Sequence, residues 1–387
     1  MKNIKVYNKI AKVGLDMLGA DYAVSAECDA PVGALVRSAD LHDEVFPSSL
    51  LAIARAGAGT NNIPTDKCGE AGIVVFNTPS ANANAVKELT LLGLLIASRR
   101  VVPAIEWAKT LKGNGAAVGS MVEKGKSQFC GPELLDKKLG VIGLGAIGVM
   151  VANAASHLGM SVYGYDPFLS LQNAWNLSRS INRANDIKEI FEKCDYISLH
   201  IPLNADTKNT INRDTLALMK DGVRIVNFAR DGLVNSADMI AALESGKVAS
   251  YVVDFPTDEM IGVDGVVAIP HLGASTPESE NNCAIMAARQ LADYIDNGNI
   301  TNSVNFPNIS MPKTPLARIC VIHKNIPNML TSITSIVAKD NVNIENLLNK
   351  SKGQLAYTMM DVEKCDTAAV CAHISALDGV IRVRVIE

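Results

Sequence analysis

Three glycines at residues 143, 145 and 148 form a pattern that can bind phosphate groups. They lie in the sequence Gly-Leu-Gly-Ala-Ile-Gly, between an apolar run at 139–142 and a segment of helical character. Gly143 permits a tight turn, Gly145 lets the backbone approach a pyrophosphate, and Gly148 lets the helix pack closely on the strand. The free N–H groups at the start of that helix attract anions. The sequence therefore predicts a dinucleotide-binding loop.

An acidic residue after the next predicted strand indicates which dinucleotide binds. Asp166 follows the run at 161–165. It lies near the spacing of about 20 residues at which a carboxylate can accept hydrogen bonds from an adenosine ribose. A carboxylate there would repel a 2′-phosphate, so the sequence favours NAD over NADP. The alternative is structural, with Asp166 serving only the turn before Pro167.

A second group of polar side chains follows three further predicted strands. Arg230 follows the first of these strands, Asp258 and Glu259 follow the second, and His271 follows the third. Open α/β sheets bind ligands at the carboxyl ends of their strands. An arginine, an acid and a histidine at that edge suit hydride removal from C2 of a 2-hydroxy acid.

Each of these side chains has a chemical role in such a reaction. His271 would take the hydroxyl proton, since imidazole titrates near neutral pH. Glu259 would stabilise the charged imidazole and raise its pKa, and Asp258 stays open as the alternative acid. Arg230 would bind the substrate carboxylate and the carbonyl oxygen as a bidentate donor. The competing interpretation is a packing histidine and surface ion pairs.

The composition excludes several other classes of protein. The 387 residues are 48% hydrophobic and 20% charged, with a net charge of −4, so the chain lacks the basic excess that binding to nucleic acid or an anionic membrane needs. Its strongest apolar run, 89–98, is far shorter than the ~20 residues of a spanning helix. No signal peptide is visible, and the eight cysteines are scattered without a C-x-x-C pair. This pattern predicts reduced thiols, a cytoplasmic location and no metal site.

The motifs lie among alternating strands and helices, which predict an α/β fold with parallel sheets covered by helices. A helix is predicted from 83 to about 111, with a break near Pro103, and a loop over 113–131. The other predicted helices are 146–158, 187–194, 236–245 and 283–297. The predicted strands are 4–7, 34–36, 52–54, 73–76, 139–142, 161–165, 196–200, 224–228, 249–254 and 266–269.

The last part of the chain shows a separate pattern. Strands at 318–323, 342–350, 355–363 and 381–386 alternate with helices at 327–339 and 367–377, in the order βαββαβ of a ferredoxin-like unit. A half-open sheet of this kind often pairs edge to edge with a second copy. The preceding segment, 302–315, contains three prolines and is predicted to be a linker.

Over nearly its whole length the chain resembles the D-isomer-specific 2-hydroxyacid dehydrogenases. The similar segments are 53–62, 75–79, 83–89, 143–148, 227–232 and 270–276. The resemblance implies two Rossmann-like or flavodoxin-like parallel-sheet lobes, with a site in the cleft between them. The implied domains are a substrate-binding domain at 1–92 completed by 283–308, an NAD-binding domain at 93–282, a linker at 309–316 and an ACT regulatory domain at 317–387.

The resemblance also implies roles for individual residues. Arg230, Glu259 and His271 correspond to the catalytic triad, although Met260 stands where the family has proline and the loop to His271 is short, so Asp258 stays open. The implied cofactor contacts, besides the glycines, are Ala146, Ile147, Asp166, Phe228, Ala229, Asp254, Gly273 and Ala274. The implied substrate contacts are Arg37, Arg55, Gly57 and Asn84. Guanidinium groups suit a phosphate, so the two arginines indicate a phosphorylated substrate.

The resemblance is greatest to members that oxidise 3-phospho-D-glycerate to 3-phosphohydroxypyruvate with NAD, the first step of L-serine biosynthesis. It implies a homodimer or tetramer and an L-serine effector site at His323, Asn325 and Asn343. Asn328 replaces a usual glycine there and would narrow that pocket. Two alternatives stay open. One is a sister dehydrogenase acting on glycerate, glyoxylate, lactate or erythronate 4-phosphate, and the other is a non-enzymatic NAD(H)-sensing scaffold.

Overall fold

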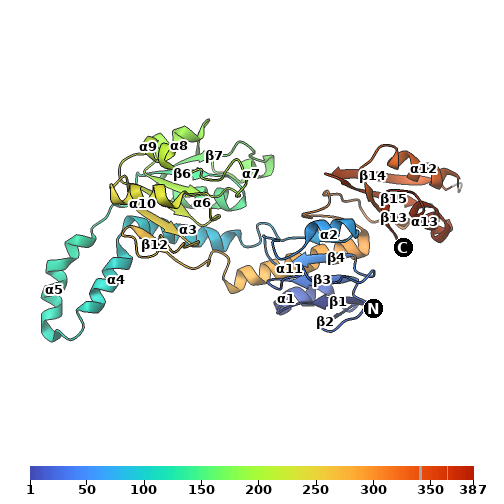
Figure 1. Ribbon diagram of the computed structural model, residues 1–387, viewed down its shortest axis with the longest axis horizontal. Coiled ribbons are helices and arrows are strands. Elements are labelled where there is room, and N and C mark those ends of the chain that lie inside the picture. Colours follow the sequence, from blue (N-terminus) through green and yellow to red (C-terminus); the bar gives the residue numbers. More distant parts are fainter. Residues whose placement is uncertain (340–341, 364) are drawn as a thin grey trace. The chain divides into compact units, whose positions relative to one another are not determined.

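The computed structural model describes residues 1–339, 342–363 and 365–387. The chain forms two compact units, of which unit 1 comprises Met1–Asn82 and Pro277–Glu387, and unit 2 comprises Ala83–Thr276 (Figure 1). The predicted domain boundaries at 92/93 and 282/283 fall inside helices α3 (Ala83–Ser98) and α11 (Pro277–Asn297). The assignment of substrate-binding and NAD-binding domains at those boundaries stays a prediction.

The N-terminal part of unit 1 is a five-stranded parallel sheet in the order β2-β1-β3-β4-β5. Its strands are β1 (Lys2–Val6), β2 (Tyr22–Ser25), β3 (Gly33–Val36), β4 (Ala52–Arg55) and β5 (Val74–Phe76). The short helices here are α1 (Lys12–Leu15), a 3-10 turn (Asp16–Leu18) and α2 (Thr65–Glu70). The sequence analysis missed β2, because only Tyr22 of this edge strand is buried and no apolar pattern marks it.

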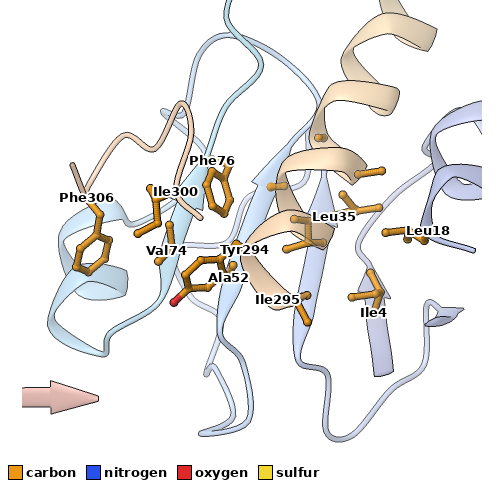
Figure 2. Packing of buried hydrophobic residues seen from close by; sticks show 14 of the residues in the cluster. Ile4, Leu18, Leu35, Ala52, Val74, Phe76, Tyr294, Ile295, Ile300 and Phe306 are labelled. Carbon is orange, nitrogen blue, oxygen red and sulfur yellow. The ribbon is translucent and has the colours of Figure 1, made fainter. Parts of the chain in front are cut away.

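Helix α11 supplies much of the core of unit 1. Its small and apolar residues recur at helical spacing, and Leu291, Tyr294 and Ile295 are buried (Figure 2). Figure 2 shows Tyr294 of α11 beside Ala52 of the sheet. The predicted helix 283–297 is confirmed and starts two turns earlier than expected.

The C-terminal part of unit 1 confirms the predicted βαββαβ order. Its antiparallel sheet has the order β14-β15-β13-β16. The elements are β13 (Ala317–Lys324), α12 (Met329–Lys339), β14 (Ile344–Lys352), β15 (Leu355–Val362), α13 (Thr367–Ser375) and β16 (Val380–Ile386). Alternate residues of β13 face opposite sides, because Ile319 and Val321 pack with the two helices while Cys320 and Ile322 join the core that contains Tyr294. Both faces of this sheet are therefore covered.

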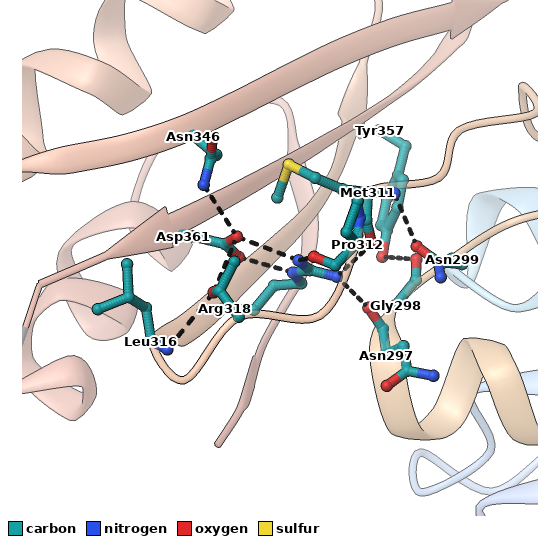
Figure 3. Close-up of polar contacts among 11 residues, drawn as sticks. Asn297, Gly298, Asn299, Met311, Pro312, Leu316, Arg318, Asn346, Tyr357 and Asp361 are labelled. Atoms are coloured by element: carbon teal, nitrogen blue, oxygen red, sulfur yellow. Dashed lines mark hydrogen bonds and ion pairs between the residues drawn. The ribbon is translucent and has the colours of Figure 1, made fainter.

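The segment predicted to be a linker has no helix or strand, but it packs against the unit. Ile309 and Met311 are buried. The guanidinium of Arg318, on β13, donates to the carbonyl oxygens of Met311 and Pro312 and forms a buried ion pair with Asp361 (Figure 3). The segment is thus fixed to the C-terminal sheet.

Unit 2 is a seven-stranded parallel sheet in the order β12-β11-β10-β9-β6-β7-β8. Its strands are β6 (Lys138–Ile142), β7 (Ser161–Tyr165), β8 (Asn182–Arg183), β9 (Tyr196–Leu199), β10 (Val223–Asn227), β11 (Val248–Val253) and β12 (Val266–Ala268). Its helices are α3, α4 (Val101–Thr110), α5 (Val118–Gly125), α6 (Ala146–His157), α7 (Leu171–Asn176), α8 (Ile187–Lys193), α9 (Arg213–Leu218) and α10 (Ser236–Glu244). The strand order reverses between β6 and β9, and open α/β sheets bind ligands at such a point.

Two details of the segment between α3 and β6 differ from the prediction. The helix breaks after Ser98, and Pro103 lies in the first turn of α4, where its missing N–H costs no hydrogen bond. The expected loop at 113–131 contains α5 and two 3-10 turns (Gly115–Ala117 and Lys126–Phe129). A Cβ on Gly125 would lie 2.3 Å from the Trp107 ring, so this glycine permits close helix packing instead of marking a loop.

Candidate active site

The glycine loop after β6 combines two packing glycines with one that faces open space. Gly143 has a φ of 92°, and a Cβ there would lie 2.6 Å from the carbonyl oxygen of His200. A Cβ on Gly148 would lie 1.9 Å from the carbonyl oxygen of Gly143. A Cβ on Gly145 would meet no atom within 4 Å. The first and third glycines are therefore required by the chain itself, whereas the second leaves room in front of the loop.

The N-terminus of α6 behind this loop is free to bind an anion. Gly145 is the N-cap, no side chain caps the helix, and its first turn carries no acidic residue. The N–H groups of Ala146 and Ile147 begin the helix, where the backbone carries a partial positive charge. The open space at Gly145 and these N–H groups fit the pyrophosphate of a dinucleotide.

Asp166 joins the glycine loop to its own turn through its two carboxylate oxygens. Its Oδ2 accepts a hydrogen bond of 2.8 Å from the Leu144 N–H, and its Oδ1 accepts one of 2.8 Å from the Phe168 N–H. The second of these is the turn that the structural alternative expected. Each oxygen has a second lone pair, so Asp166 can keep these two contacts and still accept hydrogen bonds from a ribose.

Two glycine substitutions should separate cofactor binding from folding. Gly145→Ala should leave thermal stability nearly unchanged, since its methyl group meets no protein atom, and should weaken NADH binding at least tenfold. Gly148→Ala should destabilise the protein by about 1–3 kcal/mol, the usual cost of overpacking. Thermal unfolding and a fluorescence titration with NADH measure the two effects. Equal loss of stability in both variants would contradict this assignment.

The three predicted catalytic side chains follow neighbouring strands. Arg230 follows β10, Glu259 follows β11 and His271 follows β12, and the parallel pairing of these strands brings the three loops to one edge of the sheet. All three side chains are exposed on this unit.

Asn227, the last residue of β10, fixes the loop that carries Arg230. Its buried side chain donates to the carbonyl oxygen of Arg230 at 3.0 Å and accepts from the Ala229 N–H at 3.1 Å. The sequence analysis assigned Asn227 no role. A polar residue at the end of an otherwise buried strand was the available signal.

Asp254 is a buried carboxylate near His271 and Arg230. It is 1% exposed, and neither oxygen accepts a hydrogen bond of normal geometry within the part of the chain that the structure describes. Burial raises the pKa of Asp254, and the charges of His271 and Arg230 act in the opposite direction. Both predicted catalytic side chains therefore lie within electrostatic range of one buried acid, on which the Gly273 N–H also acts.

His271 contacts an aromatic ring and no carboxylate. The centroids of its ring and the Phe255 ring are 4.6 Å apart, at an interplanar angle of 49°. Within the described residues, no hydrogen bond or ion pair joins His271 to Glu259 or to Asp258. The pairing of the imidazole with either acid stays a prediction. The contact with Phe255 was not foreseen, because ring contacts across a loop leave no periodic pattern.

The remaining predicted cofactor contacts of this unit lie near the same strand ends. Phe228 is buried in the core against Gly93, and Ala229 and Ala274 are half-buried. Gly273 is buried, and a Cβ there would lie 3.4 Å from Asp254 Oδ2. His200 lies after β9, with its Nε2 2.9 Å from Ser198 Oγ. Burial lowers the pKa of His200 to about 4, so this imidazole is neutral at pH 7.

Three of the four predicted substrate contacts lie together in unit 1. Arg55 ends β4 and donates from Nε to Asn62 Oδ1 at 2.9 Å, and a Cβ on Gly57 would lie 2.3 Å from Arg55 Nη1. Gly57 thus makes room for the guanidinium. Arg37 follows the neighbouring strand β3. Asn84 belongs to unit 2, where its side chain donates to Glu88 at 2.8 Å.

The three residues of the predicted effector site already have partners within the chain. His323 is 3% exposed, with Nε2 3.0 Å from Thr358 Oγ1 and Nδ1 2.9 Å from the Lys324 carbonyl oxygen, and burial lowers its pKa. Asn325 donates to the Gly353 carbonyl oxygen, and Asn343 donates to Glu345. Asn328 has a φ of 68°, a conformation that glycine adopts at no cost, which explains why glycine is usual there.

Among residues 1–339, 342–363 and 365–387, no group of three or more His, Cys, Asp or Glu side chains could hold a metal ion. No helix in that part of the chain is long and apolar enough to cross a membrane. Within the described residues, free thiols are found at Cys28, Cys68, Cys130, Cys194, Cys283, Cys320 and Cys371.

Comparisons with known proteins identify the family of this chain. Residues 92–273 match the NAD-binding domain of the D-isomer specific 2-hydroxyacid dehydrogenases, and residues 319–382 match the AHAS small subunit-like ACT domain. The D-3-phosphoglycerate dehydrogenase of Haemophilus influenzae is 32% identical over 349 residues, which cover 87% of this chain and 81% of that protein. The enzyme of the same name from Escherichia coli K12 is 33% identical over 350 residues, covering 87% of this chain and 82% of that protein.

A solved structure supports the same relationship. The NAD⁺-bound 3-phosphoglycerate dehydrogenase of Entamoeba histolytica superposes with a TM-score of 0.58 at 26% identity, covering 79% of this chain and 98% of that one. A glyoxylate reductase from Paecilomyes thermophila gives 0.64 at 26% identity, with 79% and 98% coverage. The chain therefore belongs to the D-isomer-specific 2-hydroxyacid dehydrogenases, a family of NAD-binding oxidoreductases.

Proposed function

We propose that this protein oxidises 3-phospho-D-glycerate to 3-phosphohydroxypyruvate, the first step of L-serine biosynthesis, with NAD⁺ as cofactor. The supporting observation is a pair of arginines in unit 1, in addition to the single Arg230 of unit 2. Arg37 and Arg55 follow neighbouring strands of unit 1 and suit a phosphate group, while Arg230 suits a carboxylate. A substrate with both groups needs both sets. The curated relatives that match most of the chain carry the corresponding name.

The residues of unit 2 would hold the cofactor and move the proton. The N–H groups of Ala146 and Ile147 would bind the pyrophosphate, and Asp166 would bind the ribose. Asp254, whose oxygens have no hydrogen-bond partner in the described chain, would accept a hydrogen bond from the cofactor. When bound, NAD⁺ supplies the hydride acceptor. His271 takes the hydroxyl proton of the substrate, and Glu259, or Asp258 in its place, stabilises the resulting imidazolium.

Arg230 would orient the reacting carbon. Its guanidinium binds the substrate carboxylate and stabilises the charge that develops on the C2 oxygen. Asn227 keeps the Arg230 loop in place through the two backbone contacts described above. Phe228, Ala229, Gly273 and Ala274 complete the cofactor contacts, and Gly57 and Asn84 complete the substrate contacts in this proposal.

Removing the two arginines should change the KM for the phosphorylated substrate. Arg37→Gln and Arg55→Gln should each raise the KM for 3-phosphoglycerate at least tenfold, because each loses a charge-assisted hydrogen bond worth about 1.5–3 kcal/mol. The KM for D-glycerate, which has no phosphate, should change little. Steady-state assays of NADH formation with both substrates measure this. Equal effects on both substrates would contradict a phosphate site.

An assay over a panel of 2-hydroxy and 2-keto acids tests the proposed substrate. The principal rival is a sister dehydrogenase, and the similarity to a glyoxylate reductase makes glyoxylate the comparison that matters. A preference for 3-phosphoglycerate supports the proposal, and a preference for glyoxylate, lactate or glycerate refutes it. NADH binding without turnover of any acid would favour the scaffold alternative.

We further propose that the C-terminal ACT domain binds L-serine as an effector. His323, Asn325 and Asn343 would contact it, and serine would have to replace the hydrogen bonds that His323 makes now. The same assay with added L-serine tests this, because an effector lowers turnover without competing with the substrate. Unchanged kinetics with L-serine would leave the domain a purely structural role.

A homo-oligomer, a dimer or tetramer, belongs to the proposal as well. Helices α4 and α5 extend from unit 2 as a hairpin, and neither contains a buried residue (Figure 1). Val101, Val102 and Ile105 of α4 are 38–50% exposed, an apolar surface that a second copy could cover. Free cysteines support a reducing compartment such as the cytoplasm.

A further inference from the structure

An acidic residue at the start of α11 faces the predicted phosphate site of unit 1. Glu280 Oε1 lies 2.8 Å from Arg37 Nη1, and the side chains are 44% and 38% exposed. Glu280 belongs to the first turn of α11, where a negative charge is favoured by the helix dipole. Neither the sequence motifs nor the proposed function uses this residue.

The same face of α11 lies against both arginines. Val36, just before Arg37, pairs with Arg55 in the parallel ladder, so the two cations leave neighbouring strands at one edge. Burial lowers the pKa of Arg55, the charge of Arg37 lowers it further, and Cys283 acts in the opposite direction. Cys283 follows Glu280 by about one helical turn. Arg37 thus contacts the carboxylate of Glu280 and also lies within electrostatic range of the second cation, Arg55.

We propose that Glu280 is an internal counterion that holds Arg37 until the phosphate of a substrate replaces it, and that thereby limits the affinity of this site for phosphate. The proposal rests on the proposed function, since it concerns the same phosphate site. Any anion must compete with a carboxylate that is already in place. A phosphate dianion succeeds, and an uncharged hydroxymethyl group does not.

The geometry of the ion pair permits this exchange. The ion pair joins Arg37 Nη1 to Glu280 Oε1, and within the described residues no hydrogen bond occupies Nε or Nη2 of Arg37. Partly exposed ion pairs are weak, so Glu280 can be replaced at little cost. A phosphate can engage two guanidinium nitrogens at once, which makes a stronger and more directional contact. The backbone of Arg37 stays fixed during the exchange, because its N–H donates to Asn8 Oδ1 at 2.9 Å.

The test uses the full-length enzyme and a matched control on the same helix turn. Glu280→Gln removes the counterion, whereas Glu278→Gln removes an equal charge from an exposed residue that has no ion pair among the described residues. Glu280→Gln should lower the KM for 3-phosphoglycerate by about two- to fivefold, the range of a released surface ion pair, with kcat unchanged. Glu278→Gln should lower it much less, and neither should alter the KM for D-glycerate.

A double-variant cycle shows whether Glu280 acts through Arg37. In an Arg37→Gln background, Glu280→Gln should have no further effect on the KM for 3-phosphoglycerate. The proposal is overturned if Glu280→Gln raises the KM for 3-phosphoglycerate, or if Glu278→Gln changes this KM by the same factor. It is also overturned if Glu280→Gln lowers this KM equally in the Arg37→Gln background. A purely structural Glu280 would raise the KM or lower kcat instead of lowering the KM.

Inorganic phosphate separates this proposal from the proposed substrate. Calorimetric titration with phosphate needs no turnover, and Glu280→Gln should bind phosphate about two- to fivefold more tightly than the unaltered enzyme. If Glu280→Gln binds phosphate more tightly but the enzyme does not oxidise 3-phosphoglycerate, the counterion role of Glu280 is supported and the proposed substrate is refuted. If the enzyme oxidises 3-phosphoglycerate but Glu280→Gln binds phosphate no more tightly, the proposed substrate is supported and the counterion role is refuted.

Discussion

Replacing His271 with asparagine should lower kcat by about 10²–10⁴-fold, the range expected when a general acid–base group is lost. Asparagine keeps a polar side chain that still packs beside Phe255, but it cannot accept the substrate proton at neutral pH. NADH binding should stay within about twofold of the unaltered enzyme, because the glycine loop and Asp166 are untouched. Stopped-flow and steady-state assays of NADH formation, with a fluorescence titration for NADH, measure both quantities.

The pH profile provides the control for this prediction. The acid limb of kcat/KM should disappear in His271→Asn if the imidazole is the base in the free enzyme. His42→Asn changes an exposed histidine of unit 1 that is paired with Asp40, and should leave the profile as it is. A small loss of kcat with an unaltered acid limb would show that another group takes the proton.

The positions of the site residues on the fold were largely predictable from the sequence. Arg230 and His271 each follow a short apolar run, and these runs become the parallel strands on either side of β11, with their carboxyl ends at one edge of the sheet. Gly143 and Gly148 were predictable for a different reason, because a side chain at either position would collide with the backbone. Local patterns are sufficient where function depends on the end of a strand or the turn after it.

What the sequence could not show are contacts that depend on tertiary packing. Glu280 and Arg37 are far apart in the chain, and no periodicity links a helix residue to a residue after a distant strand. The missing hydrogen-bond partner of Asp254 is visible only when all its neighbours are in place. For His323 the resemblance indicated an effector contact, but its burial and its bonds to Thr358 and Lys324 come from the sheet around it.

Asp361→Asn should destabilise the protein by about 3–5 kcal/mol, the cost of leaving one partner of a buried ion pair without its counterion. The side chains of Arg318 and Asp361 are 4% and 0% exposed. All five donors of the guanidinium are used, two toward Asp361 at 2.7 and 3.1 Å and three toward the carbonyl oxygens of Asn297, Met311 and Pro312 (Figure 3). The amide would accept only part of this set and would leave the positive charge unbalanced.

The location of this pair determines which part of the protein should respond. Asn297 ends α11, Met311 and Pro312 belong to the segment before β13, and Asp361 lies on β15, so the pair joins three segments of unit 1. In urea denaturation, the first transition of Asp361→Asn should occur at a lower urea concentration, because the C-terminal sheet loses its attachment to α11. Asp221→Asn, which alters an exposed ion pair with Lys247, should leave that transition unchanged.

The double variant Arg318→Met with Asp361→Leu should recover much of the lost stability, since replacing both charged side chains by apolar groups leaves no unpaired charge. Failure of the double variant to recover stability would mean that the carbonyl contacts of Arg318, not its charge pairing, hold the segments together.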